Sequence, residues 1–180
     1  NQIKFIKSLS LKKNRQKEQL FIAEGEKIVA ELLNSNFEFH EILATNEWIL
    51  KNTDIRAIKV YNSELDRISN LKSANNVLAI VKIKQENLSV TDGLTLVLDD
   101  INDPGNLGTI IRMCDWFGVK QLVCSKSTVD CFNPKVVQSA MGSLFRVPII
   151  YTDLEEYVTK VDTPIYGAFM DGENVRNVKV

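Results

Sequence analysis

A polar loop between an apolar run and an amphipathic segment carries the residues best suited to chemistry. Residues 94–98 read LTLVL, and the loop at 99–105 leads to Asn106 and, six residues later, to Arg112. In open α/β sheets, ligands bind beyond the carboxyl ends of strands, and the start of the next helix offers unpaired N–H groups suited to an anion. The pattern therefore favours a site for a phosphate-bearing ligand.

Two glycines and the arginine of this segment have both a functional and a structural interpretation. Gly105 and Gly108 would let a ligand approach the backbone closely, and the long side chain of Arg112 could return toward the helix start. In the structural interpretation, Asn106 only caps the helix and Arg112 is only a surface charge. The segment lacks the G-K-[ST] of a P-loop and the G-x-G-x-x-G of dinucleotide-binding folds. From these residues alone, both interpretations stay open.

The elements around this loop alternate between strands and helices. Strands are predicted at 94–98, 121–124, 147–151 and 164–170, and helices at 106–117, 134–140 and 153–160. The continuous apolar run at 94–98 is typical of a parallel strand that is covered on both faces. This alternation predicts an α/β domain with a mostly parallel sheet.

The first half of the chain predicts a second α/β unit. An amphipathic opening helix with a polar break is expected at 3–20, followed by a short apolar run at 21–23 that ends at a glycine turn. Further helices are expected at 26–35, 46–52 and 63–69 (capped by Ser63), and strands at 41–45, 55–61 and 77–83. The stretch 84–93 lacks periodicity and holds turn-forming residues. We therefore place a domain boundary there and predict domains at 1–88 and 89–180.

Charge is distributed unevenly along the chain. Residues 1–90 hold 14 Lys/Arg and 11 Asp/Glu, whereas residues 91–180 hold 8 and 12. Six cations of the first twenty residues, Lys4, Lys7, Lys12, Lys13, Arg15 and Lys17, face only one acid, Glu18. Such a local excess can attract phosphates, although a solvated basic helix face explains it equally well.

Composition and cysteine spacing argue against several classes of protein. With 180 residues, 44% hydrophobic and 25% charged, the chain resembles an ordinary soluble protein, and no apolar run reaches the ~18 residues of a membrane helix. Cys114, Cys124 and Cys131 form no C-x-x-C pair, so neither a metal site nor a disulfide framework is expected. Reduced thiols in a cytoplasmic protein are the simplest interpretation.

Several separated segments resemble the signature motifs of the SpoU branch (SpoU/TrmH type) of the SPOUT RNA methyltransferases. In the second half these are Asn106-x-Gly108-x-x-x-Arg112 with Phe117-Gly118, then Pro134-Lys135, Ser139-Ala140-Met141-Gly142-Ser143 and Phe145-Arg146-Val147-Pro148. In the first half, Phe21-Ile22-Ala23-Glu24-Gly25 resembles the family's FxxEG segment, and 78–81 its closing strand. The resemblance covers almost the whole chain in the expected order.

This resemblance implies a fold and an activity. It implies a ribosomal-protein-like α/β RNA-binding domain followed by a SPOUT α/β domain with a knot and a mostly parallel sheet. It also implies methyl transfer from S-adenosylmethionine to a ribose 2′-hydroxyl of rRNA or tRNA, in a homodimer. None of these properties follows from composition or spacing.

The resemblance also suggests roles for individual residues. It implies that Arg112 is the central catalytic residue and that Asn106 orients the ribose or Arg112. A ribose hydroxyl is a poor nucleophile, so its developing charge must be stabilised, and an arginine, which stays protonated, is no simple general base. The candidate RNA-binding residues are Lys12, Lys13, Arg15, Glu24 and Gly108. A structural role for Glu24 remains equally open, and Trp48 and Trp116 are expected to pack.

Two further family motifs, a Gly-Asn-Glu-Gly-like loop and a Leu-Asn-Val-Ser-like segment, are not found. The stretch Gly172-Glu173-Asn174 is no convincing substitute. We therefore expect a truncated chain that is inactive by itself, with the site for S-adenosylmethionine beyond Val180. Two alternatives remain: a non-catalytic RNA-binding module, and an α/β enzyme acting on a small phosphorylated molecule.

Overall fold

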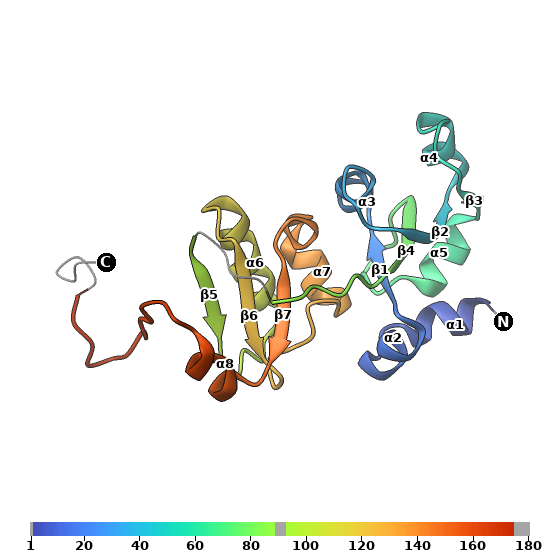
Figure 1. Ribbon diagram of the computed structural model, residues 1–180. Coiled ribbons are helices and arrows are strands. Elements are labelled where there is room, and N and C mark those ends of the chain that lie inside the picture. The colour runs from blue at the N-terminus through green and yellow to red at the C-terminus, as the bar shows by residue number, and fades with distance from the viewer. Residues whose placement is uncertain (1, 89–92, 175–180) are drawn as a thin grey trace.

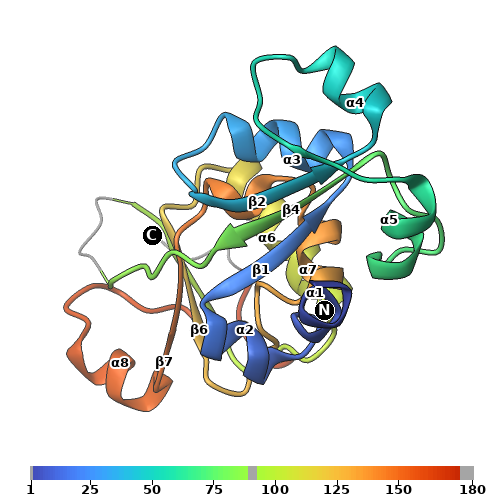
Figure 2. The same ribbon diagram turned by 90° about the vertical axis from the view of Figure 1, so that its right-hand side faces the viewer.

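The computed structural model describes residues 2–88 and 93–174 and arranges them around two β-sheets (Figure 1). Helices α6 and α7 lie between the two sheets, as Figure 2 shows with the N-terminal sheet in front of them. The boundary predicted between residues 88 and 89 adjoins 89–92, which lie outside the described residues.

The N-terminal unit is an α/β unit with a four-stranded sheet in the order β1-β4-β2-β3. Its elements are α1 (Gln2–Ser8), α2 (Lys12–Glu18), β1 (Leu20–Glu24), α3 (Glu26–Leu33), β2 (Phe39–Ala44), α4 (Asn46–Lys51), β3 (Ile58–Lys59), α5 (Asn62–Ile68) and β4 (Val77–Lys82). Strands β1 and β2 pair antiparallel with β4, and β3 pairs parallel with β2. The polar break predicted in the opening helix therefore separates two helices.

The C-terminal unit contains a three-stranded parallel sheet in the order β5-β6-β7. Its elements are β5 (Thr95–Leu98), α6 (Pro104–Trp116), β6 (Gln121–Ser125), α7 (Pro134–Ala140), the 3-10 helix η1 (Ser143–Phe145), β7 (Ile149–Thr152) and α8 (Leu154–Lys160). This confirms the predicted α/β class and the parallel sheet. Because the strands are parallel, their carboxyl ends share one edge of the sheet, which points downward in Figure 1.

Three predictions about these elements were wrong. Strand β5 is not covered on both faces, because it lies at the sheet edge; Leu94 before it is 66% exposed and Val97 within it 37%. The strand predicted at 164–170 is exposed irregular chain, since a strand needs a ladder partner and these residues pair with no strand in the described part. Ser63 does not cap α5, which begins at Asn62; instead, the Glu64 carboxylate accepts the N–H of Tyr61 at 2.9 Å.

The two units share an apolar core. The ring of Phe21 on β1 lies 4.7 Å from that of Phe132, which precedes α7, and the rings of Phe37 and Phe145 are 5.4 Å apart. Aromatic pairs at such distances add to the stabilisation from buried area. The orientation of the N-terminal unit against the C-terminal sheet is therefore set by packed side chains.

The three cysteines are all buried, whereas only one of the two tryptophans is. All three cysteines are buried and free, and burial raises the pKa of the Cys124 thiol to about 12, so it stays protonated at neutral pH. Trp48 packs in the core, as predicted, but Trp116 is 85% exposed, which contradicts its predicted packing.

No described helix could cross a membrane, and residues 2–88 and 93–174 contain no cluster of potential metal ligands.

Candidate functional site

The loop after β5 places the start of α6 at the carboxyl edge of the parallel sheet. Asp103 caps this helix, because its Oδ1 accepts the backbone N–H of Asn106 at 2.8 Å, and Pro104 occupies the first turn. The structural interpretation of Asn106 as the cap was therefore wrong. An Asp-Pro pair before a periodic segment is a readable helix start, and this signal could have identified Asp103.

The two predicted catalytic residues lie on one exposed strip of α6. This α6 strip consists of Asn106, Thr109 and Arg112. Helix geometry separates Asn106 and Arg112 by about 9 Å along the axis, and no hydrogen bond joins their side chains. Among the described residues, neither the Asn106 amide nor the Arg112 guanidinium has a side-chain partner. Both groups are therefore available to a ligand.

A second arginine of the motif series has a different environment. Arg146 donates to the Asp115 carboxylate at 2.7–3.1 Å and also pairs with Glu31 of the N-terminal unit. Hydrogen bonding to Arg146 lowers the pKa of Asp115, so this carboxylate is ionised at neutral pH. Arg146 thus links α6 to α3, whereas Arg112 has no side-chain partner among the described residues.

Gly108 lies in the contact between α6 and α7 and is buried, so the prediction that it contacts RNA was wrong. A Cβ at this position would lie 1.9 Å from Oγ and 2.7 Å from Cβ of Ser139, and 3.0 Å from the backbone N of Ala140. The absence of a side chain serves close helix packing here, not close approach of a ligand.

Replacing Gly108 with alanine is therefore expected to destabilise the protein by about 1–3 kcal/mol through overpacking, measured by chemical denaturation. Gly105→Ala is the comparison variant, because its Cβ would meet a single atom, Oδ1 of the half-exposed Asp103 side chain at 2.9 Å, instead of a packed helix, and should cost less. In a Ser139→Gly background the penalty of the Gly108 substitution should shrink. An equal penalty in both backgrounds would show that the clash is not its cause.

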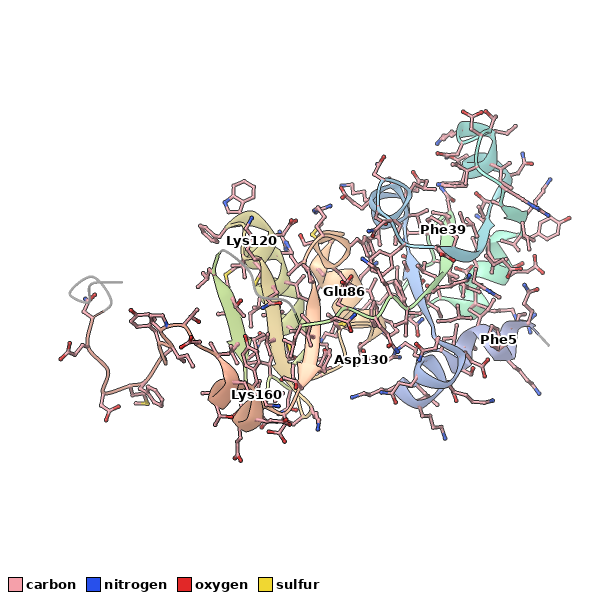
Figure 3. All side chains as sticks on the ribbon, viewed as in Figure 1. Phe5, Phe39, Glu86, Lys120, Asp130 and Lys160 are labelled. Atoms are coloured by element: carbon pink, nitrogen blue, oxygen red, sulfur yellow. The ribbon has the colours of Figure 1, made fainter. Side chains whose placement is uncertain are left out.

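Arg15 was also assigned to RNA, and this prediction was wrong as well. Its side chain is only 2% exposed and donates to Asp130 at 2.6 and 2.9 Å. Two further hydrogen bonds reach the carbonyls of Leu9 and Ser10. Figure 3 shows Asp130 at the junction of the two units. Arg15 therefore joins α2 to the loop after β6, and it has no free face for a phosphate.

Glu24 is buried at the end of β1 and holds a turn of its own unit. Its carboxylate accepts hydrogen bonds from the Ser69 hydroxyl at 2.5 Å, the Asn70 backbone at 2.8 Å and the Asn70 amide at 3.1 Å. With both oxygens engaged, Glu24 is placed to position this turn, not to contact RNA. The structural alternative considered for Glu24 is thus the one that its contacts favour.

Lys12 and Lys13 are exposed at the start of α2. The Arg15–Asp130 pair holds this helix beside the loop after β6, and Figure 1 shows α2 and the carboxyl edge of the parallel sheet on the same side of the molecule. The two lysines are therefore placed to draw a polyanion toward the side on which α6 begins. Their contact with RNA stays a prediction.

The carboxyl edge of the parallel sheet is where an open α/β sheet binds its ligands. The Ser125 and Thr128 hydroxyls lie 3.0 Å apart and accept the backbone N–H groups of Asp100 and Ile101. Two pockets of the described part lie elsewhere, one between α7 and β1 and one beside residues 84–86. At the carboxyl edge the two hydroxyls are already engaged by backbone N–H groups, so a donor site made by other residues stays a prediction.

Comparisons with known proteins match both units. Residues 93–180 match the SpoU rRNA Methylase family, and residues 1–79 match the MRM3-like substrate binding domain. A relative from Bacillus subtilis, 23S rRNA (guanosine(2553)-2'-O)-methyltransferase RlmP, is 32% identical over 171 residues, which cover 92% of this chain and 68% of the relative.

Two solved structures share the fold. A putative RNA methyltransferase of the TrmH family from Porphyromonas gingivalis has a TM-score of 0.90 and 35% identity, covering 100% of this chain and 74% of that one. An AdoMet-bound rRNA methyltransferase from Sinorhizobium meliloti has a TM-score of 0.76 and 29% identity, covering 87% and 63%. The motif series, the two packed units and these matches agree: the chain belongs to the SpoU rRNA methylase family.

Proposed function

We propose that the protein carrying this chain transfers a methyl group from S-adenosylmethionine to a ribose 2′-hydroxyl of ribosomal RNA. The observation that carries the proposal is the α6 strip, on which Asn106 and Arg112 are exposed and, within residues 2–88 and 93–174, without side-chain partners. Support comes from the relative whose name states 2'-O-methylation of 23S rRNA and from the structure that holds AdoMet. The whole protein's activity is a proposal, because the chain spans 68% and 63% of these two proteins.

The α6 strip suits the acceptor side of this reaction. When bound, S-adenosylmethionine would supply an electrophilic methyl group. As the ribose oxygen attacks, the bond from this methyl group to sulfur breaks to leave S-adenosylhomocysteine, and the hydroxyl proton passes to a substrate phosphate or to water. The planar guanidinium of Arg112 can bind a substrate phosphate with two donors and stabilise charge that develops on the oxygen. Asn106 offers an amide that both donates and accepts, which suits it to orient the ribose hydroxyls.

The test is a methyl-transfer assay with the whole protein, labelled S-adenosylmethionine and ribosomal RNA. We expect label in RNA, and nuclease digestion should yield a 2′-O-methylated nucleoside. Labelling on a base would overturn the acceptor assignment. RNA binding without any transfer would support the alternative of a non-catalytic RNA-binding module.

We further propose that the complete protein is a cytoplasmic homodimer. Apolar side chains are exposed at the end of α6: Trp116 is 85% and Phe117 76% exposed. Exposed apolar groups of this size are typical of protein contacts. Buried, free thiols fit a reducing compartment. Sedimentation of the complete protein tests the assembly, and a monomer at micromolar concentration would overturn it.

A further inference from the structure

A pocket lies between the two units, and none of the roles described above involves it. It has a volume of about 390 Å³ and lies between α7 on one side and β1 with the turn after α5 on the other. One wall therefore comes from the unit that matches a substrate-binding domain, and the other from the unit that matches the methylase family. A ligand in this pocket would contact both units at once.

The pocket combines apolar walls with amide groups. Ile22 and Val137 contribute apolar surface, and Asn70, Asn133 and Gln138 contribute side-chain amides. In the described part, the Gln138 amide and the –NH₂ of Asn133 have no hydrogen-bond partner. An amide presents a donor and an acceptor side by side, as the edge of a nucleobase does. This combination fits a flat ring with polar edges.

The one carboxylate in the pocket lining does not make it an anionic site. Glu24 is engaged by Ser69 and by Asn70, as its three hydrogen bonds show. The same contacts fix the Asn70 amide nitrogen and leave its oxygen without a partner among the described residues. Glu24 is thus a positioning residue for this wall.

Lys135 lines the pocket and lies near the start of α6. The Lys135 Nζ lies 3.7 Å from the Asp103 carboxylate, and both side chains are exposed, at 67% and 52%. Exposed pairs of this kind contribute little, so Lys135 can contact a phosphate at small cost. Because Asp103 caps α6, the pocket lies beside the turn that carries Asn106.

We propose that this pocket takes one unstacked nucleobase of the RNA substrate, with Lys135 on a neighbouring phosphate. The inference rests on the proposed function and adds a base-reading subsite to it. RNA is read mostly at splayed, single-stranded bases through stacking and polar edges, which are the two properties that the pocket walls supply. Holding such a base would position the nearby chain relative to Arg112.

The experiment measures the affinity of the whole protein for short single-stranded oligoribonucleotides, each compared with the same strand containing abasic sites. Gln138→Leu keeps the size of the side chain and removes its amide. We expect it to weaken binding of the intact strand about tenfold and to remove most of the advantage over the abasic strand. Lys135→Ala should weaken binding of all strands and lower the salt slope by about one.

Gln85→Leu, the same change at an exposed position of the 84–93 stretch, is the matched control and should leave both affinities unchanged. Thermal unfolding verifies that each variant is folded. Equal affinity of Gln138→Leu and the unsubstituted protein would overturn the proposal, as would weakened binding of S-adenosylmethionine without any change for RNA. Methyl transfer by the unsubstituted protein is measured in parallel, so failure of the pocket and failure of the proposed function give different results.

Discussion

Replacing Arg112 with alanine is expected to lower kcat for RNA methylation by about 100- to 1,000-fold, the usual loss when a group that stabilises transition-state charge is removed. The side chain is exposed and has no partner among the described residues, so the free energy of unfolding should change by less than about 0.5 kcal/mol. Single-turnover methyl-transfer rates and chemical denaturation measure the two quantities separately.

Two further variants test whether the loss of kcat depends on the guanidinium group of Arg112 itself. Arg112→Lys keeps the charge but loses the planar fork of donors, so we expect an intermediate rate. Arg56→Ala removes another exposed arginine, outside the α6 strip, and kcat should stay within twofold of the original. Wild-type kcat in the Arg112→Ala variant would remove Arg112 from the proposed mechanism, whatever its effect on RNA affinity.

Replacing Arg15 with alanine should have the largest effect on stability. Arg15 is buried and the Asp130 side chain is 15% exposed, and removing Arg15 leaves a carboxylate without its counter-charge and two carbonyls, of Leu9 and Ser10, without a donor. Breaking a buried pair in this way costs about 3–5 kcal/mol. Urea denaturation should therefore show a large drop in the free energy of unfolding, and the drop should persist at high salt because buried charges are weakly screened.

Lys12→Ala is the matched control for Arg15→Ala. It removes one cation from the same helix, but from an exposed position, and should change stability by less than about 0.5 kcal/mol. If Lys12 contacts RNA phosphates, its variant should show a lower salt slope of RNA affinity. Equal stabilities of the two variants would contradict the structural role of Arg15.

The sequence predicted most elements because local rules decide them. Alternation of strands and helices identified the parallel sheet, and the opening helix with a polar break expected at 3–20 corresponds to the two helices α1 and α2. The spacing from Asn106 to Arg112 singled out two residues that the structure places on the exposed strip of α6. Where pairing decides the outcome, prediction failed: the apolar residues at 164–170 look like a strand but have no ladder partner in the described part.

By itself, then, the sequence determined the fold class and the family and singled out Asn106 and Arg112 as candidates, because periodicity and motif spacing are local properties. Only the tertiary structure decided which charged and small residues are free to act. Arg15 and Lys12 look alike in a basic segment, yet contact with Asp130, distant in the chain, buries the first and leaves the second in solvent. Gly108 likewise has its role fixed by Ser139 on a neighbouring helix. Burial depends on long-range contacts, and these arise only when the chain folds.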